Sequence, residues 1–319
     1  MTKTGGGVAA IDCGTNSTRL LALDAAGERI ARLMRITRLG AGVDGAGVLE
    51  SAAIERTLRV LEEYREVLDR AGIEAEDVRA TATSATRDAA NAADFLEPAA
   101  KVIGVRPEVI EGDEEGRLSY LGATASLDPA GGPYLVLDIG GGSTELIVGS
   151  ERGNPVPAAV VSMDMGCVRA SERFFRSDPP SAEELHQARA AIRSLVEEVR
   201  RRDDSWRNAR QLVGLAGTVS ALTVLALGLD GFDEAKVHHA RLSRGDVRRI
   251  TDRLAAVPLA ERRCLRGMEV ERADVIIGGA LVLGEVMDAF GFGELVTSEA
   301  DILDGIAFGL LEVRAARVD

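Results

Sequence analysis

The chain has 319 residues, of which 46% are hydrophobic, and a formal net charge of −13. This length and hydrophobic content suit two domains of about 100 to 200 residues each. A strongly acidic chain lacks the basic surface with which proteins gather nucleic acid, so general nucleic-acid binding is excluded.

The three cysteines, Cys13, Cys167 and Cys264, are widely spaced and form no CxxC pair. This argues against a disulfide framework and against a zinc site, and we interpret them as small packing residues. No apolar stretch reaches the roughly 18 residues that a membrane helix needs, and the start, MTKTGGG, has no apolar signal core. We therefore expect a cytoplasmic protein with no membrane partner.

The first predicted elements are two apolar strands around a small-residue loop, VAAIDCGTNSTRLLAL at 8–23. A turn, AAGE, leads to a third strand at 30–36. An amphipathic helix follows, with Ser51 as its N-cap and Gly72 as its stop. Further on, the pattern predicts a strand and loop at 78–87, a helix at 88–104, a strand at 106–112 and a helix at 114–127, an alternation typical of an α/β domain.

The second half of the chain begins after ASLDPAGG, which we interpret as a linker near residues 123–132. Two apolar strands there surround the loop DIGGGSTE at 138–145, and a turn, ERGNP, leads to a strand at 158–163. The remaining pattern predicts a charged helix near 181–202, a strand and loop at 211–222, several helices, a strand at 294–298 and a last helix at 301–316.

The two glycine-containing loops are an internal repeat. Asp12 aligns with Asp138, 126 residues further on, and this alignment also pairs Gly14 with Gly140, Ser17 with Ser143 and Thr18 with Thr144. Small residues let successive backbone N–H groups approach phosphate oxygens, and an acid at the strand end suits a hydrated magnesium ion. A single glycine loop is equally explained by a sharp hairpin, but two matching copies favour paired phosphate sites.

The doubled D-x-G-x-x-S-T loop resembles the phosphate loops of the actin, hexokinase and sugar-kinase superfamily. Over nearly the whole chain, seven motifs are similar, in the same order, to the exopolyphosphatase and guanosine pentaphosphate phosphohydrolase family: AAIDCGTNSTRL, ATSATRDAAN, VIEGDEEGRLSYLGA, LDIGGGSTEL, MGCVRASERF, GLAGTVSAL and ERADVIIGGALVL. The resemblance implies an α/β fold of two ribonuclease-H-like (actin-like ATPase) domains that face each other across a phosphate-binding cleft. Domain I would comprise 1–125, completed by the last helix at about 299–319, and domain II would comprise 126–298.

The resemblance also implies a general base in the stretch EGDEEG. The second glutamate of the family motif S-G-x-E-E-A-R maps to Glu115, whereas Asp113 and Glu114 are equally explained as acids in the first turn of a helix. Two departures from the motif occur, Glu111 in place of a small hydroxyl residue and Gly116 in place of alanine. An extra carboxylate at 111 could alter the pKa of the base or contact a metal.

Substrate and metal ligands follow from the same motifs. Arg87 would contact phosphate, with a surface ion pair to Asp88 or Asp94 as the alternative, and the GLAGT turn would be a third phosphate contact or a plain strand-to-helix connection. The implied substrate-binding residues are Gly14, Thr15, Asn16, Ser17, Thr18, Arg87, Gly140, Gly141, Gly142, Ser143, Thr144, Gly217 and Thr218. The implied ligands of Mg²⁺, or of Mn²⁺, are Asp12, Asp138 and Glu145.

The activity implied is exopolyphosphatase, the magnesium-dependent hydrolysis of terminal phosphoanhydride bonds of inorganic polyphosphate with release of orthophosphate. Guanosine pentaphosphate as the substrate, a non-catalytic guanosine polyphosphate binding protein, and a kinase-like ATPase remain alternatives. The chain ends after the predicted last helix, without the further helical domain of longer relatives, so we expect modest oligophosphates to be hydrolysed at least as efficiently as very long chains. The sequence leaves the oligomeric state open, with a homodimer as one option.

Overall fold

The structure, a computed structural model, describes residues 6–149 and 156–318. The start at 1–5 and the turn predicted at 151–155 lie outside the described residues. By their contacts the residues form two compact units, unit 1 with Met1–Gly122 and Ile302–Asp319, and unit 2 with Ala123–Asp301. Whether each unit is an independently folding domain, with the boundary after residue 125, stays a prediction.

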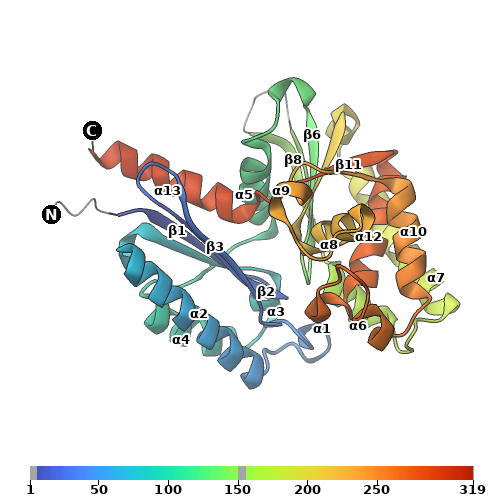
Figure 1. Cartoon of the computed structure of the whole chain (residues 1–319), viewed down its shortest axis with the longest axis horizontal. Helices are drawn as coiled ribbons and strands as arrows, with labels where there is room; N and C mark the ends of the chain where they lie inside the picture. The colour runs from blue at the N-terminus through green and yellow to red at the C-terminus, as the bar shows by residue number, and fades with distance from the viewer. Residues whose placement is uncertain (1–5, 150–155, 319) are drawn as a thin grey trace. The chain divides into compact units, whose positions relative to one another are not determined.

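Unit 1 contains a five-stranded mixed sheet in the order β3-β2-β1-β4-β5 (Figure 1). The first three strands form an antiparallel meander, while β4 and β5 run parallel to β1. Its strands are β1 (Val8–Cys13), β2 (Ser17–Leu23), β3 (Arg29–Ile36), β4 (Val78–Ala82) and β5 (Glu108–Val109). Its helices are α1 (Val43–Ala46), α2 (Ser51–Ala71), α3 (Ser84–Asp88), α4 (Ala93–Ile103), α5 (Gly112–Thr124, which begins in this unit) and α13 (Ile302–Val318).

Strand alternation divides the core of unit 1 between two faces of the sheet. Ala9 and Ile11 of β1 pack in one cluster with residues of α2 and α4, such as Leu61 and Phe95. Val8 and Ala10 point to the other face, where they cluster with residues of α13 such as Ile306. The C-terminal helix therefore completes the unit that the N-terminal strand begins.

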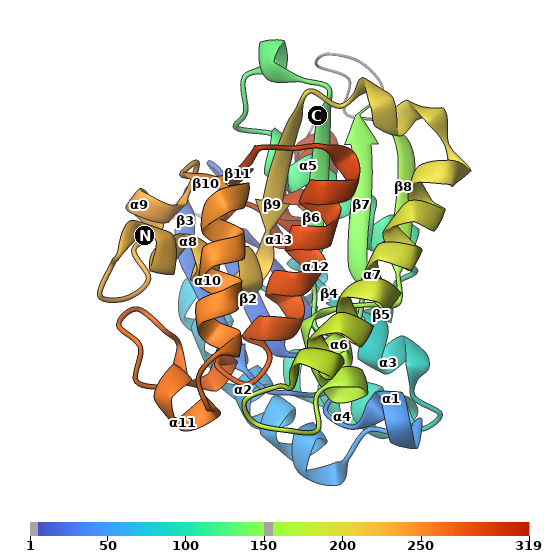
Figure 2. The same cartoon turned by 90° about the vertical axis from the view of Figure 1, so that its right-hand side faces the viewer.

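Unit 2 contains a six-stranded sheet in the order β10-β11-β9-β6-β7-β8. Its strands are β6 (Tyr134–Ile139), β7 (Thr144–Gly149), β8 (Pro157–Met163), β9 (Gln211–Leu215), β10 (Arg241–Ser243) and β11 (Glu294–Thr297). Its helices are α6 (Cys167–Phe174), α7 (Ala182–Arg202), α8 (Ala216–Leu227), α9 (Glu234–Val237), α10 (Arg244–Ala255), α11 (Leu259–Arg262) and α12 (Ile276–Phe290). Helix α12 lies between α7 and α10 in Figure 2, and its residues from Ile276 to Met287 are all buried.

Both units share one topology, which confirms the predicted ribonuclease-H-like α/β fold. In unit 2, β6, β7 and β8 form the antiparallel meander, and β9 and β11 add in parallel next to β6. Strands β1, β2, β3, β4 and β5 thus correspond in order and direction to β6, β7, β8, β9 and β11. The phosphate loops that the sequence repeats therefore occupy the same place in each sheet, the first hairpin.

The start of α2 differs from the prediction. Ser51 is the first helical residue, and the N-cap is Glu50, whose side chain makes no capping hydrogen bond. The predicted stop is confirmed, since Gly72 ends the helix with a φ of 69°, which glycine adopts without a steric penalty.

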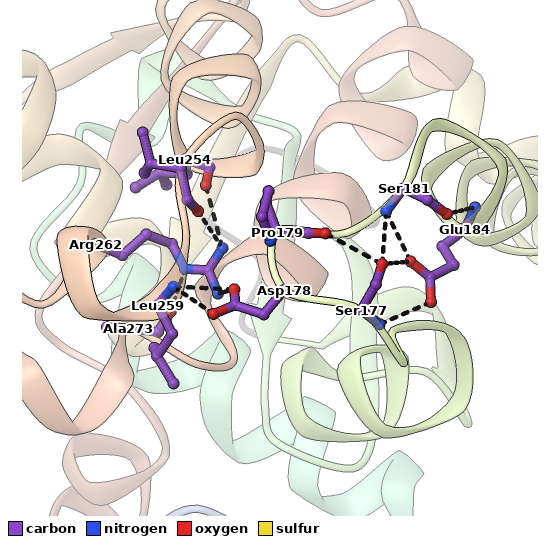
Figure 3. A network of polar contacts seen from close by, with 10 residues as sticks. Ser177, Asp178, Pro179, Ser181, Glu184, Leu254, Leu259, Arg262 and Ala273 are labelled. Carbon is purple, nitrogen blue, oxygen red and sulfur yellow. Dashed lines mark hydrogen bonds and ion pairs between the residues drawn. The ribbon is translucent and has the colours of Figure 1, made fainter.

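The start of α7 is fixed by a capping box (Figure 3). The Glu184 carboxylate accepts hydrogen bonds from the backbone N–H of Arg176, Ser177 and Ser181 and from the Ser177 hydroxyl. These donors, led by the Ser177 hydroxyl, lower the pKa of Glu184 to about 2. The carboxylate therefore stays ionised at any pH near neutrality and holds the 176–181 loop against the helix.

The same loop is tied to α11 by a buried arginine. The Arg262 guanidinium donates to Asp178 and to the carbonyl groups of Leu254 and Ala273, and Asp178 also accepts from the Leu259 N–H (Figure 3). These contacts satisfy the buried Arg262 guanidinium and hold the 176–181 loop against α11.

No helix in the described ranges has the length and apolar character that spanning a membrane requires.

Candidate active site

The turn of the first phosphate loop closes through a backbone hydrogen bond that its glycine makes possible. The Gly14 N–H donates to the Ser17 carbonyl at 3.0 Å, and a Cβ placed on Gly14 would lie only 3.0 Å from that oxygen. At the equivalent place in unit 2, a Cβ on Gly140 would lie 3.1 Å from the Ser143 carbonyl oxygen. The two predicted loops therefore share a geometry as well as a sequence.

Two carbonyl groups of the first loop accept backbone hydrogen bonds from residues 37–40, the segment that follows β3. The Thr15 carbonyl accepts from the Gly40 N–H at 2.9 Å, and the Asn16 carbonyl accepts from the N–H groups of Thr37 and Arg38 at 3.1 and 2.9 Å. A trans peptide holds its C=O and N–H in opposite directions. The N–H groups of the two residues after these carbonyls, Asn16 and Ser17, therefore point away from this chain segment.

The second loop is held in the same way by the start of α6. The Gly140 carbonyl accepts from the Cys167 N–H at 2.9 Å, and the Gly141 carbonyl accepts from Val168 and Arg169 at 2.9 and 3.1 Å. The N–H groups of Gly141 and Gly142 consequently point away from α6. Successive N–H groups that point to one side suit an anion, so the predicted phosphate-binding role of each loop is compatible with its backbone geometry and stays a prediction.

Gly166 permits this contact, and the sequence analysis did not single it out. A Cβ at this position would lie 2.4 Å from the Gly141 carbonyl oxygen and 2.5 Å from that of Gly140. Only glycine allows α6 to approach the loop so closely. The signal was present in the MGCVRASERF motif, but the motif alone does not say which backbone the glycine meets.

The threonines at the ends of the loops, Thr18 and Thr144, are fully buried and bonded within the protein. The Thr18 hydroxyl lies 2.9 Å from the Thr37 hydroxyl, and the Thr144 hydroxyl donates to the Met165 carbonyl at 2.6 Å. Both contacts tie the loop to the segment after the third strand of its meander. A role of these two residues in substrate binding stays a prediction.

The acids at the strand ends face different partners in the two units. Asp12 lies opposite Arg19 across β1 and β2, and the Arg19 Nη2 atom is 2.6 Å from Asp12 Oδ2. Asp138 lies opposite Glu145 across β6 and β7. Glu145 is completely buried, and its Oε1 atom accepts from the Ser162 hydroxyl at 2.7 Å.

These partners are themselves equivalent, because Arg19 and Glu145 are 126 residues apart, like Asp12 and Asp138. Unit 1 carries its own cation beside the aspartate, whereas unit 2 places two carboxylates opposite each other on adjacent strands. Ionised carboxylates at this spacing repel one another, and a bound divalent cation relieves the repulsion. A role of Asp12, Asp138 and Glu145 as metal ligands stays a prediction, and no group of three or more His, Cys, Asp or Glu residues in the described ranges is placed to hold a metal ion.

Glu115 lies in the first turn of α5 and is paired with Arg87. The Arg87 Nη1 atom is 3.3 Å from Glu115 Oε2 and donates to the Ile110 carbonyl at 2.6 Å. Both side chains are mostly buried, with exposed fractions of 12% for Glu115 and 17% for Arg87. The structure thus brings together the predicted base and the predicted phosphate-binding arginine, which does not pair with Asp88 or Asp94.

The neighbouring acids have structural contacts. Glu111 is exposed, and its carbonyl accepts from the N–H groups of Glu114 and Glu115, so it begins the helix. The sequence analysis missed Arg79 of β4, whose Nη2 atom lies 2.9 Å from Glu108 of β5 and 2.6 Å from Glu114 of α5. Arg79 and Arg87 together fix the segment 108–115, which ends at the candidate base.

The predicted third turn, at Gly217 and Thr218, is the junction of β9 and α8. Ala216 there has a φ of 64°, a left-handed conformation that is unusual for alanine and is enriched at active sites and ligand-binding turns. A Cβ on Gly217 would lie 2.2 Å from the Arg272 guanidinium, so the glycine leaves room for a buried arginine. Arg272, which lies in the ERADVIIGGALVL motif, was also missed as a candidate site residue.

The two cysteines near the loops, Cys13 and Cys167, are buried and have raised thiol pKa values. Burial, and to a smaller extent the Asp12 carboxylate, raise the pKa of the Cys13 thiol far above its usual range. Burial likewise raises the pKa of Cys167. The thiolate is the reactive form of cysteine, and a raised pKa disfavours it. This agrees with the interpretation of Cys13 and Cys167 as packing residues.

Comparison with known proteins places this arrangement in a family. Residues 23–313 match the model of the Ppx/GppA phosphatase family. The chain belongs to the Ppx/GppA phosphatase family. Exopolyphosphatase 2 of Mycobacterium tuberculosis (strain H37Rv) is 42% identical over 319 residues, an alignment that covers 95% of this chain and 98% of that protein. A bifunctional 3-dehydroquinate synthase/phosphatase of Fusobacterium nucleatum is 32% identical over 93% of this chain, but the match covers 45% of that longer protein.

Three solved structures share the fold over 95% or more of this chain. The crystal structure of an exopolyphosphatase-like protein is 36% identical and covers 97% of this chain and 99% of that one, with a TM-score of 0.91. The Ppx/GppA enzyme of Aquifex aeolicus is 33% identical, with coverages of 95% and 99% and a TM-score of 0.78. An exopolyphosphatase from Cytophaga hutchinsonii is 25% identical, with coverages of 96% and 98% and a TM-score of 0.87.

Proposed function

We propose that this member of the Ppx/GppA phosphatase family is an exopolyphosphatase, which hydrolyses the terminal phosphoanhydride bond of inorganic polyphosphate and releases orthophosphate. The observation that carries the proposal is the 42% identity, along almost the full length of both chains, to a mycobacterial exopolyphosphatase. Two loops with N–H groups pointing to one side support it, because phosphoryl oxygens are hydrogen-bond acceptors with negative charge.

In the reaction, a water molecule attacks the terminal phosphorus atom in line with the bridging oxygen. The new P–O bond forms as the bridging P–O bond breaks, and the shortened polyphosphate leaves with the bridging oxygen. Glu115 takes the proton of the attacking water as general base, and Arg87 holds the Glu115 carboxylate in place. A general base contributes about 10² to 10⁴ in rate, and positioning with charge stabilisation contributes most of the rest.

The loop N–H groups of each unit bind phosphoryl oxygens in this proposal. In unit 2, Asp138 and Glu145 would hold a divalent cation. Such an ion, when bound, offsets the charge that develops on the phosphoryl oxygens. In unit 1, the Arg19 guanidinium is fixed beside Asp12 and supplies positive charge at the equivalent position without a metal.

The direct test compares two substrates. Purified protein is incubated with polyphosphate and, in parallel, with guanosine pentaphosphate at the same free magnesium concentration, and released orthophosphate is measured. The proposal expects a higher kcat/KM for polyphosphate. A higher value for guanosine pentaphosphate would identify the protein as a nucleotide phosphohydrolase of the same family, and no release from either would leave a binding protein.

A further inference from the structure

Three buried polar side chains of unit 1 have hydrogen-bonding atoms with no partner among the described residues. They are the Nδ2 atom of Asn16, the Oγ atom of Ser84 and the Oγ1 atom of Thr86. The residues are only 6%, 2% and 1% exposed. Within the described part of unit 1, every buried side-chain atom of this kind belongs to these three residues.

The three residues come from two segments that are packed together at the phosphate loop. The Ala85 N–H donates to the Thr15 hydroxyl at 3.3 Å, and the Thr83 N–H donates to the Cys13 carbonyl at 3.4 Å. A Cβ placed on Gly40 would lie 2.5 Å from Thr15 and 2.6 Å from Ala85, so the Gly40 backbone packs tightly against both residues. Residues 84–86 therefore lie directly against loop 13–16.

Four other buried threonines of the same unit, Thr18, Thr37, Thr57 and Thr81, have hydroxyls that are bonded within the protein. The Thr57 hydroxyl donates to the Ala53 carbonyl at 2.8 Å, the Thr81 hydroxyl donates to the Ile11 carbonyl at 3.3 Å, and Thr18 pairs with Thr37. A buried hydroxyl without a partner costs the folded state free energy, and native proteins contain few of them. Their concentration beside one loop points to a partner from outside the chain.

The chemistry of the three groups limits what that partner is. An amide NH₂ donates, and hydroxyls donate readily to an anion. Arg87, the next residue after Thr86, contributes a guanidinium that is paired with the Glu115 carboxylate at 3.3 Å, while the acid of α3, Asp88, is exposed. Neutral donors beside an arginine suit an oxyanion that carries only acceptor atoms, and a phosphoryl group is such an anion.

We propose that Ser84 and Thr86 are phosphoryl-binding residues, which donate hydrogen bonds from their side-chain hydroxyls to oxygens of a phosphoryl group beside loop 13–16. The inference rests on the proposed function, because it takes polyphosphate as the source of that group. It adds a second layer of donors, supplied by α3, to the N–H groups of the loop and the amide of Asn16.

The test removes one hydroxyl while keeping the shape of the side chain. Thr86→Val should leave the melting temperature of the ligand-free protein unchanged or raise it, because the hydroxyl has no protein partner to lose. The same variant should raise KM for tripolyphosphate about 10-fold, as loss of a hydrogen bond to a charged group does. Ser84→Ala should act in the same direction, and Thr86→Ser should restore KM because it restores the hydroxyl.

The matched control is Thr57→Val, which removes a bonded hydroxyl from α2. It should lower the melting temperature and leave KM for tripolyphosphate unchanged. The proposal is overturned if Thr86→Val behaves like this control, with a lower melting temperature and an unaltered KM.

Calorimetric titration with orthophosphate separates this inference from the activity itself. If the wild-type protein releases no orthophosphate from polyphosphate, the proposed function fails. The orthophosphate affinities of wild type and Thr86→Val still decide the binding role in that case. A weaker affinity of the variant supports the inference, and equal affinities, or no binding by wild type, overturn it.

Discussion

The charge at one pair of equivalent residues distinguishes the two phosphate loops. Asp12 faces Arg19, whose guanidinium is 2.6 Å away, and Asp138 faces Glu145 on the neighbouring strand. The first loop thus has a cation beside its aspartate, and the second has a second acid opposite its aspartate. Our proposal therefore places the divalent cation in unit 2.

This asymmetry predicts unequal effects of two matched substitutions. Asp138→Asn should raise the magnesium concentration for half-maximal activity by about 10-fold or more, because it removes a carboxylate from the pair that fits the cation. Asp12→Asn should change that concentration much less, since the Asp12 carboxylate is engaged by Arg19. Orthophosphate release measured over a magnesium titration gives both values. Equal shifts in the two variants would show that both aspartates bind the metal.

The base assignment is tested at Glu115. Glu115→Gln keeps the shape of the side chain but cannot take a proton, so kcat should fall by about 10² or more while the melting temperature changes little. The control is Glu114→Gln, which alters the neighbouring acid held by Arg79 and should retain turnover within a few-fold. Near-normal kcat in Glu115→Gln would remove Glu115 from the mechanism.

At the scale of the elements, α6 fixes the second loop through a single close approach. The carbonyl oxygens of Gly140 and Gly141 would lie 2.5 and 2.4 Å from a Cβ on Gly166, well inside van der Waals contact. The atoms that such a Cβ meets are backbone atoms, which cannot move aside as the end of a flexible side chain can. Any side chain at position 166 must therefore push α6 away from the loop. The direction of the loop N–H groups depends on that contact.

Gly166→Ala should therefore lower kcat/KM for polyphosphate by about 10² or more, because the loop N–H groups that we propose to bind phosphate lose their alignment. The control is Gly284→Ala within α12, where a Cβ meets nothing within 4 Å. That change should preserve activity and stabilise the fold by about 0.5–1 kcal/mol, since alanine is the better helix residue. Activity assays and urea unfolding distinguish the two variants, and an active Gly166→Ala protein would contradict the role of the contact.

The sequence predicted those elements whose pattern is local. The paired hairpins, the amphipathic α2 and the turn at Gly72 all follow from neighbouring residues, and the structure confirms them. The cap at Ser51 was wrong because the turn begins at Glu50, one residue earlier. Single-residue boundaries depend on backbone geometry that composition does not fix.

The residues near the candidate site that the sequence analysis missed have their partners far along the chain. Arg79 meets Glu114 across 35 positions, and Gly217 makes room for Arg272. Ser84 and Thr86 are unremarkable in sequence, since a serine or threonine before an arginine is common in a loop. Their significance appears only when burial and the lack of a protein partner are both known.

At the scale of the whole molecule, the net charge of −13 opposes the substrate. The local donors of each unit act on the phosphates that occupy the site. Every further phosphate of a long chain experiences the field of an acidic protein, and this repulsion reaches over about one Debye length. The effect of substrate length on kcat/KM should therefore depend on the ionic strength.

We expect the preference for long polyphosphate over tripolyphosphate to rise with salt concentration. The kcat/KM for long polyphosphate, counted per chain end, is divided by that for tripolyphosphate, so that contacts common to both substrates cancel. Between about 0.01 M and about 0.15 M salt the Debye length falls from about 30 Å to about 8 Å, which screens the repulsion on the remote phosphates. With free magnesium held constant, the ratio should increase several-fold over this range. A ratio that falls with salt would instead require an attractive, basic path for the remote phosphates, because screening lowers the ratio only where the remote phosphates are attracted to the protein.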